Sequence, residues 1–248
     1  MIDQSRLWDE DAAAAYDTPG EGAFAPEVLE PTVALLSELA AGGRAVEFAI
    51  GTGRIAIPLR EAGVEVAGIE LSEPMIARLR GTADETTVPV VHGDMTTASA
   101  GEGFSLAYLV FNTIANLLTQ EEQVECFRNA ARHLAPGGCF VIELWVPQLR
   151  ALAPGHGGTL EVAENDYLLI DTYDLLHQRV ISHHVRFDPV IDGSREARID
   201  RTPHRYIWPA ELDLMAQIAG FRLEERYAGF DRSPFTAESR SHVSVYRL

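Results

Sequence analysis

Short apolar runs alternate with amphipathic segments up to about residue 145 of this chain. Such runs predict strands, and here they fall at 45–50, 64–69, 88–92, 106–111 and 139–144. Helices are expected between them; one from Thr119 begins with a capping box that ends at Glu122. Strands that alternate with helices in this way are typical of a parallel sheet with helices on both faces.

The pattern changes after residue 145. A connection rich in Pro and Gly covers 146–160, and 160–206 then predicts an antiparallel unit of three strands. The first of these strands joins 160–162 with 167–173, and the others are expected at 179–187 and 195–206. A last helix is expected at 209–219, followed by strands at 221–228 and 242–247.

The end of the first predicted strand carries the most informative chemistry. Val46–Ile50 is followed by Gly51-Thr52-Gly53, and Glu70 ends the second strand 17 residues after Gly53 (70 − 53). Glycines at such a turn let the backbone bend sharply and come close to a ligand. An acid at about that distance can accept hydrogen bonds from ribose hydroxyls, so the pattern predicts a nucleoside-type cofactor.

The glycine turn alone leaves two classes of enzyme open. Gly51-x-Gly53-x-x-Ala56 also satisfies the dinucleotide fingerprint, which keeps an NAD(P)-dependent oxidoreductase as an alternative. Glu47 argues against it, because burying a charge in an apolar strand is costly unless the charge has a partner. Asp94 and Met95 follow the third strand, where a carboxylate and a thioether can meet an adenine.

These motifs resemble those of class I S-adenosylmethionine-dependent methyltransferases. The first family motif matches Glu47–Gly53, the second Glu70–Met75, the adenine motif Gly93–Met95, and the turn into the fifth strand Leu134–Gly138. The resemblance implies an α/β fold with a doubly wound, mostly parallel seven-stranded sheet. An antiparallel β cap is inserted after the fifth strand. The resemblance divides the chain into three parts. These are a helical lead-in and lid (1–44), a cofactor-binding core in two segments (45–150 and 207–248), and the cap (151–206).

The resemblance also implies the cofactor, S-adenosyl-L-methionine, which leaves as S-adenosyl-L-homocysteine. In the position of the first family glycine this chain has Ala49, whose methyl group is expected to push the methionine moiety outward. The residues expected to bind the cofactor are Tyr16, Glu47, Ala49, Ile50, Gly51, Gly53, Arg54, Glu70, Leu71, Met75, Gly93, Asp94, Met95, Phe111 and Asn112.

Acceptor-binding residues are expected after the fourth and fifth strands and in the cap. Because His183 and His184 are adjacent in a predicted strand, they point to opposite faces, and His183 is the weak candidate for a base or substrate contact. His177 and His204 have less support, and no spacing suggests a metal site. The substrate-binding candidates are Thr113, Asn116, Trp145 and His183.

The net charge limits the kinds of partner that the protein can bind. The 248 residues include 20 Lys and Arg against 37 Asp and Glu, a net charge of −17. Such a field repels phosphate backbones and anionic membrane surfaces. We therefore expect a cytoplasmic enzyme that methylates an oxygen or nitrogen of a small molecule, with no nucleic acid or membrane partner. A non-catalytic S-adenosylmethionine-binding protein is the other alternative, and the oligomeric state is left open.

Overall fold

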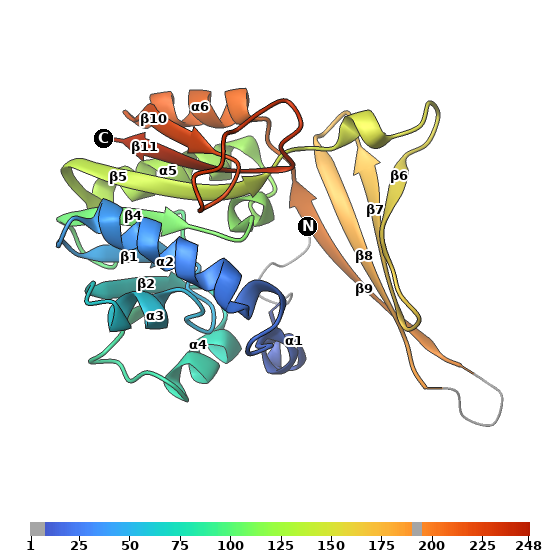
Figure 1. The fold of residues 1–248 in the computed structure, drawn as a ribbon, viewed down its shortest axis with the longest axis horizontal. Coiled ribbons are helices and arrows are strands. Elements are labelled where there is room, and N and C mark those ends of the chain that lie inside the picture. Colours follow the sequence, from blue (N-terminus) through green and yellow to red (C-terminus); the bar gives the residue numbers. More distant parts are fainter. Residues whose placement is uncertain (1–7, 190–194) are drawn as a thin grey trace.

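The computed structural model describes residues 8–189 and 195–248, so that parts of the predicted lead-in and cap, 1–7 and 190–194, lie outside the described residues. A seven-stranded sheet forms the core, with strand order β10-β11-β5-β4-β1-β2-β3 (Figure 1). All neighbouring strands from β5 to β3 are parallel, whereas β11 is antiparallel to both of its neighbours. The strands are β1 (Ala45–Phe48), β2 (Val66–Glu70), β3 (Val90–His92), β4 (Phe104–Leu109), β5 (Leu134–Trp145), β10 (Arg222–Tyr227) and β11 (Ser241–Arg247).

Helices cover both faces of this sheet (Figure 1). On one face α5 and α6 pack Phe127 and Leu212 into a cluster with Phe48 and Phe140. On the other, α2 and α3 pack into a second cluster around Tyr108. The helices are α1 (Glu10–Tyr16), α2 (Pro26–Ala40), α3 (Ala56–Glu61), α4 (Glu73–Arg80), α5 (Gln120–His133) and α6 (Pro209–Ile218), with short 3-10 turns η2 (Gly22–Phe24), η3 (Thr113–Asn116) and η4 (Leu149–Ala151). The doubly wound fold class is confirmed.

Two strands differ from the predicted bounds for local reasons. Strand β4 ends at Leu109, because Phe111 and Asn112 adopt left-handed backbone conformations that leave the sheet. Strand β5 begins at Leu134, and its register with β4 shifts between Phe104 and Leu106. The predicted turn Leu134–Gly138 is therefore an irregular first part of the strand, which includes Gly137 at φ 80°.

The antiparallel cap has four strands where three were predicted. The predicted first strand is two, β6 (Gly158–Ala163) and β7 (Tyr167–Asp174), which pair with each other. They are followed by β8 (Arg179–Phe187) and β9 (Ala197–Arg205), in the order β6-β7-β8-β9. The cap and α1 lie on the side of the core at which the parallel strands end (Figure 1).

A buried ion pair joins the cap to the core. The guanidinium of Arg205, at the end of β9, donates to the carboxylate of Glu211 on α6 (2.6 Å) and to Oε1 of Gln123 on α5 (2.6 Å). Gln178, just before β8, also accepts from Arg205 (3.1 Å). Arg205 is only 6% exposed, so the last residue of the cap is fixed between the two helices.

Candidate functional site

The glycine turn after β1 bends the backbone at the centre of the sheet. The order β4-β1-β2 makes this the topological switch point, where open α/β sheets bind ligands. Gly51 and Gly53 have φ of 58° and 84°, and Ala49 also lies in the left-handed region, at 52°. A Cβ added to Gly51 would meet no atom within 4 Å, so open space adjoins the turn.

Glu70 ties this turn to the end of β2. The backbone N–H of Gly51 donates to its Oε2 and that of Ser72 to its Oε1, both at 2.8 Å. Each carboxylate oxygen can accept a second hydrogen bond. Burial raises the pKa of Glu70, and the backbone N–H groups oppose that shift by favouring the charged form. The carboxylate is thus fixed in place and still able to accept from a ligand.

Glu47 is a buried acid in the middle of β1. It is 4% exposed, and Tyr108 on the adjacent β4 donates its hydroxyl to Oε2 (2.9 Å). Burial raises the pKa of Glu47 to about 8, although the Tyr108 hydroxyl and the charge of Arg54 lower it. A carboxyl group in this state gains free energy from a cation brought next to it.

Residues before α2, in the predicted lid, contact the glycine turn. Tyr16 packs edge-on against Phe24, with ring centroids 5.9 Å apart, and burial raises its pKa while nearby Arg54 lowers it. Asp17 accepts from the Thr52 hydroxyl of the turn (2.7 Å). Arg54 donates to the carbonyl oxygen of Ala23 (3.0 Å). The lid and the glycine turn are therefore connected directly.

The predicted adenine residues follow β3 and begin α4. Both hydrogen bonds that Thr96 donates to Asp94 go to Oδ1. Gly93 has no room for a side chain, because a Cβ there would lie 2.7 Å from that of Ala98. Three predicted side chains, those of Ile50, Met75 and Met95, are buried within the protein, and Leu71 is 36% exposed.

The backbone after β4 is held in an unusual shape at the same edge. Phe111 and Asn112 have φ of 57° and 63°, which costs free energy for residues other than glycine. Glu143 of β5 holds both residues: its Oε2 accepts from the N–H of Phe111 (2.7 Å) and its carbonyl oxygen from that of Asn112 (3.3 Å). Asn112 Oδ1 in turn accepts from the N–H of Trp145 (2.7 Å). The Phe111 ring is consequently 45% exposed, with the Arg54 guanidinium 4.9 Å from its centroid.

Asn116 and Trp145, two predicted substrate residues, meet at a histidine from the cap. His204 of β9 donates from Nδ1 to Oδ1 of Asn116 (3.1 Å), and its ring is edge-on to Trp145 with centroids 5.6 Å apart. Burial, with a smaller contribution from His184, lowers the pKa of His204 to about 4. Thr113, at the start of η3, donates its hydroxyl to the carbonyl oxygen of Val110 (2.8 Å).

His183 does not join this group. The register pairs His204 with Val180, so His204 shares its face of the cap with even-numbered β8 residues. His183 therefore lies on the opposite face, where it bonds to the Thr172 hydroxyl (2.9 Å). The structure thus separates His183 from Asn116 and Trp145, and its role as a substrate contact stays a prediction.

The sequence interpretation missed Glu143 and Tyr108, and it gave His204 little support. Glu143 could have been found, because it is an acid inside an apolar strand, the signal that identified Glu47. Tyr108 and His204 carry no such signal, since their roles depend on the residues paired across from them. No group of three or more metal-ligating side chains gathers anywhere in 8–189 and 195–248. Nor does the described part of the chain contain a helix long and apolar enough to cross a membrane.

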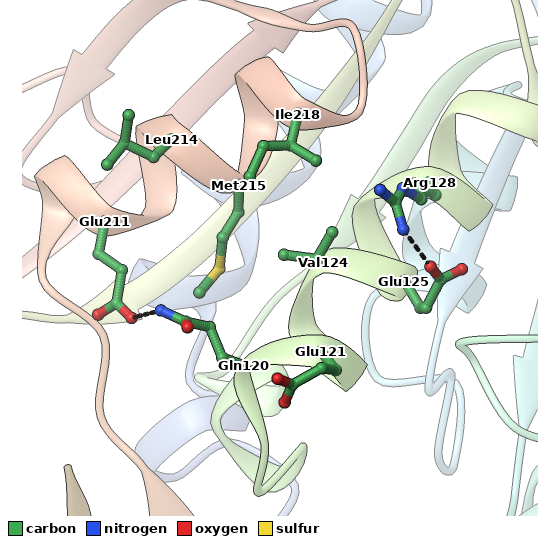
Figure 2. A pocket seen from close by; sticks show the side chains of 9 residues that line it. All are labelled: Gln120, Glu121, Val124, Glu125, Arg128, Glu211, Leu214, Met215 and Ile218. Atoms are coloured by element: carbon green, nitrogen blue, oxygen red, sulfur yellow. Dashed lines mark hydrogen bonds and ion pairs between the residues drawn. The ribbon is translucent and has the colours of Figure 1, made fainter. Parts of the chain in front are cut away.

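A surface cavity of about 420 Å³ lies between α5 and α6 and contains none of the predicted site residues (Figure 2). Leu214, Met215 and Ile218 of α6 line it together with Val124 and Glu121 of α5. Gln120 donates to Glu211 across it (2.8 Å), so one wall is part of the network that fixes the cap. The cavity thus belongs to helix packing, away from the glycine turn.

Comparison with known proteins finds methyltransferases. A family model described as a methyltransferase domain matches residues 45–138. The CcbJ methyltransferase from Streptomyces caelestis is a solved structure 34% identical to this chain. It aligns over 100% of this chain and 99% of its own, with a TM-score of 0.84.

Curated relatives include enzymes that act on nitrogen. A cypemycin N-terminal methyltransferase from a Streptomyces species is 26% identical over 99% of this chain and 98% of that protein. A dTDP-4-amino-2,3,4,6-tetradeoxy-D-glucose N,N-dimethyltransferase from Saccharopolyspora spinosa is 32% identical over 58% of this chain and 59% of that protein.

Proposed function

Because the chain belongs to the class I S-adenosylmethionine-dependent methyltransferases, we propose that its acceptor is an amine nitrogen of a small molecule. Membership of this family favours methyl transfer from S-adenosylmethionine over the two alternatives that the sequence left open, an oxidoreductase and a non-catalytic binder. The proposal concerns two points: whether the acceptor atom is nitrogen or oxygen, and which residues bind the cofactor and the acceptor.

The residues at the glycine turn fit the cofactor chemically. The open space beside Gly51 admits a ligand close to the backbone. The free acceptor positions on Glu70 suit two ribose hydroxyls, and Glu47 is a buried carboxyl group that a cationic ligand would stabilise in its charged form. The site thus offers acceptors for the hydroxyls and an acid for the positive charge of S-adenosylmethionine.

We assign the remaining cofactor contacts from the same edge. Asp94 Oδ2 faces the adenine amine in this assignment, while Gly93, Leu71 and the backbone of Ile50 line the nucleoside. The buried side chains of Met75 and Met95 support this wall from behind. Tyr16, Ala49, Gly53, Arg54, Phe111 and Asn112 surround the methionine end.

One observation carries the choice of nitrogen. The cap and lid bind the acceptor, so a relative is informative only where the alignment includes them. The cypemycin N-terminal methyltransferase aligns over 99% of this chain, and its name gives an amine as the acceptor. The net charge of −17 supports this choice, because amines are largely cationic at neutral pH and concentrate in a negative field.

S-adenosylmethionine supplies a methyl group on a positively charged sulfur, which is a good leaving group. The chain's part is to hold an amine lone pair in line with that group and to exclude water. Positioning of this kind contributes about 7–11 kcal/mol. Phe111, Asn112, Asn116, Trp145 and His204 are the residues placed to do this, since they gather where β4 and β5 end.

Matched pairs of acceptors would test the proposal. Purified protein and S-adenosylmethionine are incubated with amino sugars and short peptides, and with their hydroxyl or N-acetylated counterparts. Mass spectrometry then reports methyl incorporation. We expect methylation of the amines only, and its loss in Glu70→Ala together with binding of S-adenosylhomocysteine. Methylation of hydroxyl counterparts with inert amines would assign the enzyme to oxygen acceptors.

A further inference from the structure

His204 is a histidine of the cap that contacts the core where two parallel strands end. It reaches from β9 of the cap to two neighbours at the strand ends: Asn116 follows β4, and Trp145 ends β5. Those strand ends border the glycine turn, since β4 is paired with β1. His204 is therefore the titratable side chain through which the cap meets the acceptor side of the site.

Asn116 sets which nitrogen of His204 carries the proton. An amide oxygen can only accept, so Nδ1 must donate to Oδ1 of Asn116. In a neutral imidazole the other nitrogen, Nε2, then has a free lone pair. The ring is half-buried and packs edge-on against Trp145, which fixes the direction of that lone pair.

The surroundings of His204 keep the ring neutral. Burial lowers its pKa to about 4, and the charge of His184 acts in the same direction. Val180, across from it on β8, is apolar and 2% exposed. At neutral pH the ring therefore offers an acceptor at Nε2 and no charge that would repel an amine.

We propose that Nε2 of His204 accepts a hydrogen bond from an N–H of the acceptor amine and so aims the nitrogen's lone pair at the methyl group. This inference rests on the proposed function. An amine that arrives as a cation first loses one proton to solvent. Its nitrogen lone pair then forms the new N–C bond, and the electron pair of the broken S–C bond stays on sulfur. The nitrogen becomes positively charged and releases its proton to solvent, because a ring with so low a pKa holds no proton at neutral pH.

Two substitutions of His204 distinguish the roles of its two ring nitrogens. The amide of Gln can place an acceptor near Nε2, whereas the shorter amide of Asn reaches only the position of Nδ1. We expect His204→Asn to lower kcat for the amine about tenfold and His204→Gln to stay within about threefold of wild type. Dissociation constants for S-adenosylhomocysteine should not change. The same exchanges at His156, an exposed histidine before β6, serve as controls and should leave both constants unchanged.

Nuclear magnetic resonance of ¹⁵N-labelled histidine gives a second measurement that does not require turnover. His204 should show the Nδ1–H tautomer and no titration between about pH 5.5 and 8. Asn116→Asp should raise the pKa of His204, because a carboxylate favours the imidazolium, and it should lower kcat as Nε2 becomes a donor.

The outcomes are distinct. Equal losses in both His204 variants, with lowered melting temperatures, would assign His204 to packing against Trp145 and overturn the inference. Wild-type kinetics in His204→Asn would overturn it as well. If wild-type protein methylates only hydroxyl counterparts, it is the proposed function that fails; if it methylates amines and the variants match it, only the role of His204 fails.

Discussion

Replacing Glu47 with Gln should stabilise the ligand-free protein, although we assign Glu47 to the cofactor site. The carboxyl group is buried in β1, and burial raises its pKa to about 8 from the reference value of 4.5. Gln has the same shape, and its amide oxygen can accept from the Tyr108 hydroxyl in place of Oε2. The substitution removes the titration and retains the packing.

The size of the effect follows from the two pKa values. At pH 7 the unfolded chain has lost the Glu47 proton and the native state has kept it. Each pH unit between 4.5 and 7 therefore costs the native state about 1.36 kcal/mol, or about 3 kcal/mol in total. The native state binds more protons than the unfolded state in this window, so its stability falls as pH rises from about 4.5 to 8 and is then constant with respect to Glu47.

Urea unfolding at two pH values would measure this contribution. We expect Glu47→Gln to match wild type near pH 4.5 and to exceed it by about 4 kcal/mol at pH 8, because the free-energy cost of the raised pKa grows up to that pH. Exposed Glu30 provides a matched control, and Glu30→Gln should change stability equally at both pH values. Glu47→Gln should also weaken binding of S-adenosylmethionine, because an amide cannot balance its positive charge. A variant that loses stability at pH 8, or gains as much at pH 4.5, would refute the reasoning.

Three further substitutions test the backbone and the cap by urea unfolding. Ala49→Gly should raise the free energy of unfolding by less than about 1 kcal/mol. Glycine relieves the left-handed conformation of Ala49, worth about 1–2 kcal/mol, but its flexibility in the unfolded chain offsets most of this gain. A clear loss of stability would contradict this. Gly68→Ala should cost about 1–3 kcal/mol, because its Cβ would lie 2.5 Å from Cδ1 of Ile50, and an unchanged midpoint would disprove the overlap. Arg205→Ala should cost about 3–5 kcal/mol by leaving Glu211 without its partner, and a loss below about 1 kcal/mol would show that the pair does not anchor the cap.

The core was predictable because its signals are local. The glycine turn, the acid at Glu70 and the capping box at Thr119 each depend on residues close in sequence. The capping box is present as predicted, with Glu122 N–H donating to Thr119 Oγ1 (3.2 Å) and Thr119 N–H donating to Glu122 Oε2 (2.9 Å). The five parallel strands were likewise found within a few residues of their bounds.

What failed depends on pairing between distant segments. Phe111 was placed inside a strand because the run 106–111 is apolar, and only Glu143, 32 residues later (143 − 111), explains why the backbone turns away there. His183 was preferred because its alternate neighbours are apolar. The pairing of Val180 with His204 puts His183 and His204 on opposite faces of the cap, and that register is not visible in either strand alone.

Two adjacent residues of β9 make different contacts with the core. Side chains alternate along a strand, so Arg205 points between α5 and α6 while His204 points toward Asn116 and Trp145. The ion pair that fixes Arg205 therefore also fixes the position of His204. In the role proposed for His204, the free energy of this ion pair affects where the acceptor nitrogen is held as well as the stability of the protein. An enzyme that works by positioning gains from such an arrangement, because a small displacement of the acceptor costs rate even when every group remains present.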